Sequence, residues 1–395
     1  MGMTDADFAV IGGGPAGASA ARRLAERGAG VILFERRPMP RDKPCAGAIS
    51  AKGLSWLGLP LPASLVDADV YGGRLYLGGD RMIEARLDRR IGILVSRPRF
   101  DQFLVGKAEE SGARVVWQHV QALDVRPDGV KIRTPQGEFR VRCAILCEGA
   151  AGGLARHVRP RDPPGRRAFC LEANIPVRRP DPHADLAGLL GVHFNVVRRG
   201  YGWVFHHGSY YSVGLGALGS SLDRPLEAFR RFVADRGLSL DGVRVRGHMV
   251  PCGGVRRQVV ADRLLLAGDA AGFVDPILWE GISYAIRSGQ LAADAAMDAA
   301  GRGDLSRRGL APYARLCHDA FGRDLRIARL LRQLAHYWPA RGRMPGDAAT
   351  EVFRRYLHLS FEDDTYRDFL WWLIRRAPGL WLRSVWPQRS GGAPL

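Results

Sequence analysis

Apolar positions in the first third of the chain fall into short runs separated by stretches with helical spacing. The runs at 8–11 and 31–34 predict two buried strands, and the helix-forming stretch at 16–27 between them predicts a helix. Together these segments form a strand–helix–strand unit with a glycine-rich turn. Further along, we expect a helix over 100–111, followed by strands over 114–117, 122–125, 130–133 and 139–146.

The pattern changes between about residue 165 and residue 250, where short alternating segments are punctuated by Pro and Gly. Segments 192–197, 202–205 and 212–215 predict an antiparallel sheet, interrupted by a helix over 225–236. A buried strand at 264–267 and a long helix over 276–300 follow, and the rest of the chain is largely helical. These elements predict an α/β protein whose domains are interleaved along the sequence.

The composition narrows the class of protein. The 395 residues suffice for two or three domains, and the 46% of hydrophobic residues is ordinary for a globular chain. The net charge is +18, but the basic residues are spread along the chain, so we expect no nucleic-acid partner. An arginine-rich composition explains the charge, and attraction to an anionic membrane is the alternative. The six cysteines include no Cys-x-x-Cys pair, so we expect reduced thiols and no metal centre.

Neither a signal peptide nor a transmembrane helix is predicted from the sequence. We therefore expect a cytoplasmic protein, with peripheral attachment to the inner membrane as an alternative. The segment 365–389 mixes Trp with Arg, which suits either the headgroup region of a membrane or a helical lid on the domain below. The sequence leaves the oligomeric state open.

A dinucleotide-binding motif lies in the first strand–helix–strand unit. Gly12, Gly14 and Gly17 occupy the three glycine positions of G-x-G-x-x-G, which allow a tight turn and a close approach of the backbone to a pyrophosphate. The start of the helix then offers free N–H groups to the phosphates, and Glu35 ends the second strand, where a carboxylate can bind ribose hydroxyls. The candidate cofactor-binding residues here are Gly12, Gly14, Pro15, Ala16, Gly17, Glu35 and Arg36.

A second motif, far downstream, distinguishes FAD from NAD. The buried strand at 264–267 runs into Gly268-Asp269 and then into small residues. This arrangement resembles the flavoprotein superfamily that includes aromatic hydroxylases, halogenases and geranylgeranyl reductases. The resemblance implies that Asp269 holds the ribityl chain of FAD and that the next helix begins beside the isoalloxazine ring. Asp269 as an ordinary helix cap is the structural alternative.

Two weaker motifs resemble the same superfamily. Glu148-Gly149 resembles its Asp-Gly motif, in which the Asp touches FAD and the pyridine nucleotide, but Glu replaces Asp here and Gly152 replaces a usual Ser. Arg97 resembles the arginine at the start of a helix that reaches FAD, although a surface arginine is an equal alternative.

Three further motifs indicate one branch of this superfamily. Lys43-Pro44-Cys45-Ala46-Gly47 resembles the Lys-x-Cys-Gly-Gly loop of geranylgeranyl reductases, with Ala46 in place of the first Gly. The resemblance implies that Cys45 faces the flavin and the substrate and that Cys45, Ala46 and Gly47 bind the cofactor. A buried apolar thiol is the alternative for Cys45. Pro276 with Glu280, Gly281 and Ile282 resembles the Pro-x-x-x-Glu-Gly segment beside the flavin, with Trp279 where Gly is common, so we expect a narrower pocket.

The most specific motif is Tyr201-x-Trp203-x-Phe205, followed after seven residues by Gly214-x-Gly216. It resembles the Tyr-x-Trp-x-Phe-Pro and Gly-x-Gly pair of geranylgeranyl reductases, with His206 in place of Pro. Alternation along a strand puts the three aromatic side chains on one face, where they suit the wall of a cavity for a long apolar chain. An ordinary sheet core is the alternative. The candidate substrate-binding residues are Tyr201, Trp203, Phe205, Gly214, Gly216 and Trp279.

The resemblance implies a Rossmann-like FAD-binding domain interleaved with an antiparallel-sheet substrate domain, plus a helical C-terminal region. We assign residues 1–65, 95–165 and 250–305 to the first, 66–94 and 166–249 to the second, and 306–395 to the third. The implied function is an FAD-dependent reductase of carbon–carbon double bonds in a prenyl, geranylgeranyl-like substrate, with hydride from flavin N5. An FAD-dependent monooxygenase or halogenase and an electron-transfer flavoprotein are the alternatives.

Candidate catalytic residues are Cys45, near the reacting carbon, and His206 and His207, for proton supply or nicotinamide contact. NAD(P)H and ferredoxin are the candidate electron donors. The specific prenyl or other apolar substrate is left open.

Overall fold

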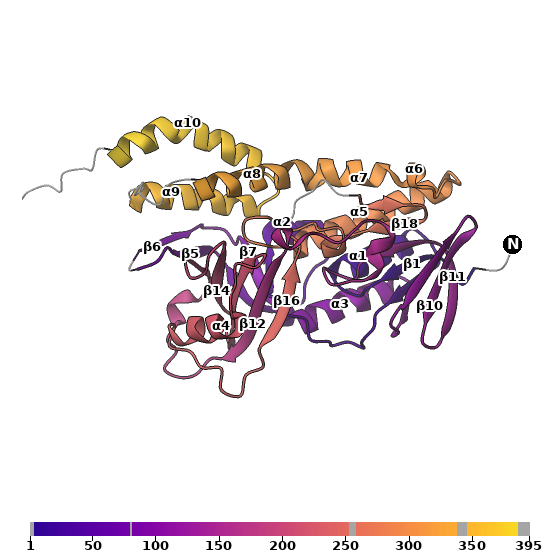
Figure 1. The fold of residues 1–395 in the computed structure, drawn as a ribbon, viewed down its shortest axis with the longest axis horizontal. Coiled ribbons are helices and arrows are strands. Elements are labelled where there is room, and N and C mark those ends of the chain that lie inside the picture. The colour runs from indigo at the N-terminus through magenta and orange to yellow at the C-terminus, as the bar shows by residue number, and fades with distance from the viewer. Residues whose placement is uncertain (1–3, 80, 253–257, 338–345, 386–395) are drawn as a thin grey trace, which may run out of the picture.

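The computed structural model describes residues 4–79, 81–252, 258–337 and 346–385. Two large β-sheets lie side by side along the long axis of the molecule, and the helices of the last third of the chain run along one side of both (Figure 1). This arrangement confirms the predicted α/β class with a helical C-terminal region. The exact domain limits stay a prediction.

The first sheet is built around the predicted strand–helix–strand unit. Its five central strands run parallel in the order β18-β11-β1-β2-β8, and β17, β10 and β9 extend it in antiparallel pairings. The apolar runs in β1, β2, β18 and the second half of β11 are buried, as expected for parallel strands with both faces covered. The strands are β1 (Ala6–Ile11), β2 (Val31–Phe34), β8 (Arg114–Val116), β9 (Ala122–Arg126), β10 (Gly129–Thr134), β11 (Gly137–Leu146), β17 (Val260–Ala261) and β18 (Leu264–Leu266).

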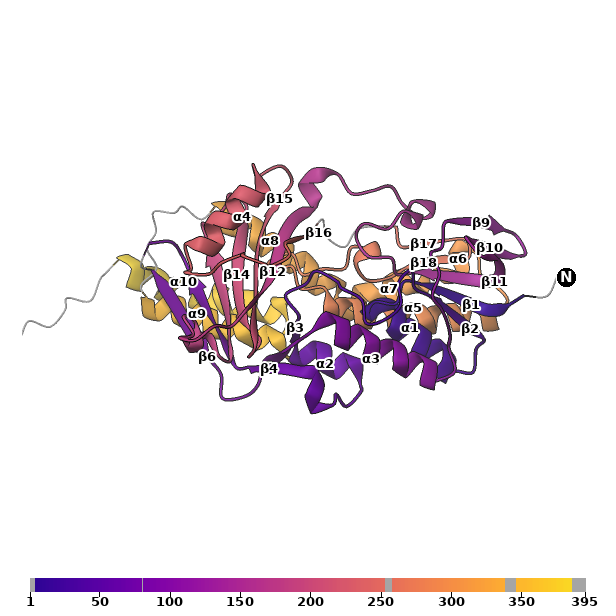
Figure 2. The ribbon, with the colours of Figure 1, turned by 90° about the horizontal axis from the view of Figure 1, so that it is seen from below.

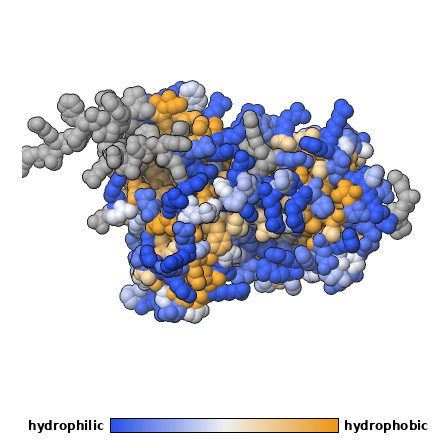
Figure 3. Space-filling view, viewed as in Figure 1, coloured by the Kyte–Doolittle hydropathy of each residue, from blue (hydrophilic) through white to orange (hydrophobic). Residues whose placement is uncertain are grey.

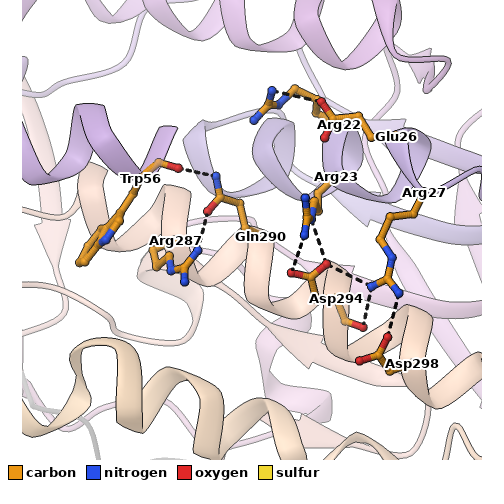
Figure 4. Close-up of polar contacts among 9 residues, drawn as sticks. All are labelled: Arg22, Arg23, Glu26, Arg27, Trp56, Arg287, Gln290, Asp294 and Asp298. Carbon is orange, nitrogen blue, oxygen red and sulfur yellow. Dashed lines mark hydrogen bonds and ion pairs between the residues drawn. The ribbon is translucent and has the colours of Figure 1, made fainter. Parts of the chain in front are cut away.

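Three helices accompany this sheet: α1 (Pro15–Glu26), α3 (Arg97–Glu110) and α5 (Ile282–Gly301). α1 and α5 lie roughly 250 residues apart in the sequence but pack closely in the fold. They can do so because alanines and glycines face each other across their contact. Ion pairs join their solvent edge, where Arg23 and Arg27 contact Asp294 and Arg27 also reaches Asp298 (Figure 4). The two sequence segments that carry the glycine motif and the Asp269 motif are thereby held together.

The second sheet has the order β16-β12-β15-β14-β13-β5-β6 and is antiparallel except where β13 meets β5. Strand alternation gives it two apolar faces. Helix α4 (Pro225–Ala234) covers one face through Phe229 and Phe232, which pack with Val204 and Tyr211 (Figure 2). The strands are β5 (Gly72–Tyr76), β6 (Met82–Arg86), β12 (Ala168–Pro176), β13 (Leu189–Phe194), β14 (Gly200–His206), β15 (Tyr210–Leu218) and β16 (Arg246–Val250).

A small sheet of β3 (Ala48–Ser50), β7 (Gly92–Val95) and β4 (Val66–Val70), with α2 (Ala51–Leu57) beside it, connects the two large sheets. The C-terminal helices then return across both. They are α6 (Arg307–Leu310), α7 (Pro312–Cys317), α8 (Arg323–Tyr337), α9 (Gly346–Leu357) and α10 (Tyr366–Val385), with a π-helical turn between α7 and α8. Phe353 and Leu357 of α9 pack with the aromatic side chains on the second face of the second sheet.

Two predicted elements differ from the observed ones. The long helix begins at Ile282 rather than at Pro276, because the Asp275 carboxylate accepts hydrogen bonds from the N–H groups of Ile277 and Leu278 and holds a loop there. Strand β13 spans Leu189–Phe194 rather than 192–197, because Asn195 takes a left-handed conformation with φ of 60° and starts the turn to β14.

Across the described ranges, no helix has both the length and the apolar composition needed to cross a bilayer. Of the Trp residues in the predicted Trp/Arg segment and its neighbourhood, Trp338 and Trp386 lie outside the described residues.

Candidate active site

A single cavity of about 500 Å³ joins the two large sheets. At one end it reaches the glycine turn at the start of α1, and at the other it reaches the aromatic face of the second sheet. The loop that contains Cys45, the end of β18 and the segment before α5 lie between these ends. Four sequence regions that the motifs had marked separately therefore line one continuous space.

The cofactor end is shaped by the backbone at the N-terminus of α1. Gly14 precedes the helix, and no side chain caps its first turn, so N–H groups remain available to an anion. A Cβ atom on Gly12 would lie 2.5 Å from the carbonyl oxygen of Cys147, and one on Gly17 would collide with the carbonyl oxygen of Gly12. The glycines thus keep strand, turn and helix in close contact, which fits the pyrophosphate cradle expected for FAD.

Glu35 lies beside this cradle and is buried. Its carboxylate accepts hydrogen bonds from the N–H groups of Gly13, at 3.0 Å, and Arg37, at 3.2 Å, and it pairs with Arg41 at 3.1 Å. Arg41 also pairs with Asp101. These contacts hold Glu35 at the cavity wall, where the sequence predicts a ribose ligand; that role stays a prediction.

Glu148 takes a conformation that explains both departures from the Asp-Gly motif. Its carboxylate turns back into its own loop and accepts a hydrogen bond from the N–H of Leu154 at 2.9 Å. A Cβ atom on Gly152 would lie 2.8 Å from Oε2 of this carboxylate, so the longer acid leaves no room for a serine there. Burial raises the pKa of Glu148 above its ordinary value. Glu148 and Gly149 still line the cavity.

Three polar side chains meet at the middle of the cavity. Lys43 Nζ lies 3.2 Å from Nε2 of His248, and the same ring nitrogen lies 3.9 Å from Asp269. Burial lowers the pKa of Lys43 to about 8. Burial alone would raise the pKa of Asp269, but the close approach of His248 and the charge of Lys43 outweigh this effect, so the pKa of Asp269 lies below its ordinary value. Asp269 is therefore an ionised acceptor at the end of β18, as a ligand of ribityl hydroxyls would be.

Arg97 and Cys45 lie next to this group. The Arg97 guanidinium forms a bidentate pair with Asp101, with both contacts at 2.8 Å, so its charge is balanced within α3 although it lines the cavity. Cys45 is half-buried, and its sulfur accepts a hydrogen bond from the N–H of Gly47 at 3.5 Å. Cys45, Ala46 and Gly47 all line the cavity, between its cofactor end and its aromatic end.

The apolar end is the face of the second sheet that looks toward α9. Tyr201, Trp203 and Phe205 alternate along β14, and all three side chains line the cavity, as predicted for one strand face. Trp279 stacks obliquely on Tyr201, with ring centroids 4.6 Å apart. Apolar surface of this extent suits a long hydrocarbon chain.

Gly214 and Gly216 lie behind this aromatic wall and do not line the cavity themselves. The strand register sets Trp203 opposite Gly214 and Tyr201 opposite Gly216. A Cβ atom on Gly216 would lie 2.9 Å from the Trp279 ring and 2.5 Å from the Cys170 sulfur, and one on Gly214 would collide with the Trp203 ring. The predicted direct binding role is thus corrected: these glycines make room for the rings that bind.

The C-terminal helices close this end of the cavity. The hydroxyl group of Tyr366 donates to Asp275 at 2.6 Å and lies 3.2 Å from the hydroxyl group of Tyr356. Both tyrosines line the cavity, so α9 and α10 are fastened to the loop before α5. In that loop Glu280 accepts a hydrogen bond from the N–H of Ser283 at 2.8 Å, and burial raises the pKa of Glu280 to about 7. These helices therefore form a lid on the cavity through their tyrosines, whereas the choice between packing and membrane contact for the Trp residues stays a prediction.

Several predicted site residues lie outside the cavity lining. His206 points to the opposite face of β14 from Phe205 and pairs with Asp181 at 2.9 Å, because successive side chains alternate. His207 is buried beneath the Cys45 loop, bonded to Asp67 and to the carbonyl oxygen of Ala46. Neither histidine reaches the cavity, which corrects their assignment as catalytic candidates. Three predicted cofactor residues are adjacent in sequence to residues of the cavity lining but do not line the cavity themselves: Gly17, Gly268 and Pro276.

Other cavity residues were not marked by any motif. Glu172 and His248 come from β12 and β16, and Tyr356 and Tyr366 come from the C-terminal helices. Its strand position opposite Gly214 of the Gly-x-Gly motif could have indicated Glu172, but the pairing of distant strands has no local sequence signal. Lys43 belongs to the Cys45 motif, and its contact with His248 depends on the meeting of the two sheets.

The fold and this cavity define the class of protein: an FAD-dependent oxidoreductase. The FAD dependent oxidoreductase family matches residues 7–59, where the glycine turn and Glu35 lie. The chain belongs to the geranylgeranyl reductase family. It is 32% identical over 340 residues to the digeranylgeranylglycerophospholipid reductase of Methanothrix thermoacetophila, covering 81% of this chain and 84% of that protein. Digeranylgeranylglycerophospholipid reductase 1 of Methanopyrus kandleri is 30% identical over 350 residues, covering 83% of this chain and 90% of that protein.

Solved structures agree on the fold. A geranylgeranyl bacteriochlorophyll reductase-like protein from Thermoplasma acidophilum superposes with a TM-score of 0.79 and 22% identity, covering 96% of this chain and 98% of that one. A variant of a flavin-dependent brominase also superposes, with a TM-score of 0.69 and 17% identity over 96% and 100% of the chains. At these identities the likeness concerns the fold alone.

Proposed function

We propose that this protein reduces carbon–carbon double bonds in a prenyl, geranylgeranyl-like lipid. The observation that carries the proposal is the continuous cavity that joins the α1 cradle to the aromatic face of the second sheet, with Cys45 between them. A flavin site alone would need no apolar extension of this kind. The names of the archaeal relatives, which refer to digeranylgeranylglycerophospholipid, support a prenyl chain as the occupant.

Bound FAD in its reduced form supplies a hydride to such a reaction. The protein positions the partners: the N-terminus of α1 and the glycine turn would hold the pyrophosphate, Glu35 a ribose and Asp269 the ribityl chain. Tyr201, Trp203 and Phe205 would hold the chain along the sheet. Because a trisubstituted alkene is unactivated, exclusion of water by the lid and close positioning must supply much of the rate enhancement.

Mass spectrometry of prenyl substrates tests this function. The FAD-loaded protein is reduced chemically and incubated without air with geranylgeranyl diphosphate or with a digeranylgeranylglycerol phospholipid. Products heavier by pairs of hydrogen atoms are expected, and cofactor-free protein is the control. Unchanged substrates with fully reduced, FAD-loaded protein would contradict the proposal. NAD(P)H and ferredoxin can then be compared as electron donors.

A second candidate function is favoured by the likeness to flavin-dependent halogenases. On this reading the cavity holds an apolar or aromatic substrate that is oxygenated or halogenated. Such a product forms only in air and gains oxygen or halogen, so the same assay with and without air separates the two functions.

We further propose a contact between α10 and a membrane surface, from which a lipid substrate would be taken. Trp371 is 54% exposed and Ile374 is 52% exposed, and Arg375 and Arg376 beside them are also exposed. Apolar side chains gather over the second sheet and the neighbouring C-terminal helices on the face shown in Figure 3. Exposed Trp with Arg suits the headgroup region of an anionic bilayer. Replacement of Trp371 and Ile374 by Ser should weaken co-sedimentation with phosphatidylglycerol vesicles, and unchanged binding would refute this contact.

A further inference from the structure

Two carboxyl groups share one arginine at the edge of the second sheet. Arg246 of β16 pairs with Glu172 of β12 at 3.2 Å and also with Asp42 of the Cys45 loop. Asp42 has an exposed side chain (41%), whereas the Glu172 side chain is 4% exposed. Since one guanidinium balances one carboxylate, the exposed acid keeps the charge more easily, and the buried acid is the one that retains a proton.

Glu172 faces the cavity where its two halves meet. It lies on the same strand face as Cys170, and the strand register sets Gly214 beside it and Trp203 beyond. Because Gly214 has no side chain, none stands between Glu172 and Trp203 on this face of the sheet. The Cys45 backbone contacts the same carboxyl group. Glu172 is thus placed between the Cys45 loop, on the cofactor side, and the ring that would hold the substrate chain.

The other carboxyl groups that line the described cavity are engaged elsewhere. Glu35 is held by two N–H groups and Arg41, and Glu148 is turned into its own loop. Asp269 is ionised, and Asp275 accepts hydrogen bonds from Tyr366 and two backbone N–H groups. Glu280 accepts a hydrogen bond from an N–H of the first turn of α5.

We propose that Glu172 is the proton donor for reduction of a prenyl double bond in this cavity, an inference that rests on the function proposed above. Reduction breaks the π bond and forms two C–H bonds. One carbon receives a hydride with its electron pair, supplied by reduced FAD, and the other receives the proton of the Glu172 carboxyl group. Glu172 is left as a carboxylate and regains a proton from water before the next turnover.

The surroundings of Glu172 suit this task. Burial raises its pKa to about 7, and Asp42 adds to this effect, whereas Arg246, Arg97 and the Cys45 backbone act in the opposite direction. Tyr210 and Cys170 also face it and are neutral, because burial raises the pKa of both side chains. An acid that titrates near neutral pH can both give up a proton and regain it.

Four forms of the FAD-loaded full-length protein test the inference: wild type, E172Q, D42N and R246M. The first readout is infrared spectroscopy without substrate, in which the carboxyl C=O bands of Glu172 and Glu280 in wild type should both vanish near neutral pH. The Glu280 band should remain in E172Q, which separates it from the Glu172 band, missing in this variant. The Glu172 band should titrate at lower pH in D42N, where the Arg246 charge stabilises only the Glu172 carboxylate. It should titrate at higher pH in R246M, where this positive charge is lost.

The second readout is single-turnover reduction of geranylgeranyl diphosphate without air, with chemically reduced protein. The wild-type rate should fall as the pH rises through about 7, because only the protonated acid reacts. E172Q should be slower by about 100-fold and lose this dependence, with an unchanged FAD content. The D42N and R246M profiles should shift in opposite directions, which a merely structural effect would not produce.

The outcomes are distinguishable. A wild-type protein that reduces no prenyl substrate overturns the proposed function. If wild type is active, an E172Q protein that keeps its rate or its pH dependence overturns the assignment of the proton to Glu172. If E172Q does not fold, equal profiles for D42N and R246M overturn it instead.

Discussion

Replacement of Gly216 by alanine should disturb the aromatic end of the cavity more than its size suggests. Gly216 lies on β15 between Cys170 of β12 and Tyr201 of β14. Its missing side chain leaves the space into which the Trp279 ring and the Cys170 sulfur fit. A Cβ atom would lie 2.9 Å from Trp279 Cζ3 and 2.5 Å from Cys170 Sγ.

The size of the effect follows from these two contacts. Non-bonded carbon atoms sit at about 3.5–4.0 Å, so the ring must move by roughly 0.6 Å or more and the sulfur by about 1 Å. Overpacking of a buried site costs about 1–3 kcal/mol in the free energy of unfolding. Because Trp279 lines the cavity and stacks on Tyr201, a displaced ring should also reduce the space for a prenyl chain.

Urea unfolding of G216A against wild type measures the loss of stability. The matched control is G106A in α3, where a Cβ atom meets nothing within 4 Å and alanine should stabilise the helix by about 0.5–1 kcal/mol. The double variant C170A/G216A removes the sulfur from the clash, so its loss should be smaller than the sum of the two single losses. A G216A protein as stable as wild type, or additive losses in the double variant, would refute this account of the wall.

Three further results are expected. G17A should abolish FAD binding, because a Cβ atom would collide with the Gly12 carbonyl oxygen. Flavin absorbance after desalting measures this, and retained flavin would contradict the assignment of the glycine turn as the pyrophosphate site. Y366F should lower the free energy of unfolding by about 1–3 kcal/mol and speed hydrogen exchange in α10, because buried Asp275 loses a hydrogen-bond donor. Unchanged exchange would contradict the role of Tyr366 in holding α10 on the loop before α5. The third result concerns E280Q. In wild type, the pKa of Glu280 is about 7 in the folded state and 4.5 in the unfolded state, so the stability of wild type falls as the pH rises between these values. E280Q should therefore gain up to about 3 kcal/mol over wild type between pH 5 and pH 8, and a constant difference would contradict the burial of the carboxyl group.

Local chemistry was readable from the sequence because it depends on neighbours along the chain. The strand–helix–strand unit and its glycine turn depend on a run of adjacent residues, and the sharing of one face by Tyr201, Trp203 and Phe205 depends on the two-residue period of a strand. The same period should have excluded His206 from that face, since it follows Phe205 directly.

The boundary between loop and helix before α5 was not readable in this way. Residues 276–281 have a composition that is compatible with a helix, but the Asp275 carboxylate accepts hydrogen bonds from two backbone N–H groups of this segment. The same carboxylate accepts a hydrogen bond from Tyr366, which lies about 90 residues further along the chain. A tertiary contact of this kind outweighs a weak local preference for helix.

The sequence by itself determined the dinucleotide cradle and the α/β class, because both follow from short motifs and periodic burial, and its resemblance to flavoproteins indicated FAD. Only the tertiary structure decided which groups share the cavity with them. The pairing of β12 with β16 brings Glu172 and His248 to the same cavity, and the approach of the Cys45 loop brings Lys43 to His248. Strand register and sheet contact are set by packing over the whole domain, so the residue proposed to hold the proton has no signature of its own in the sequence.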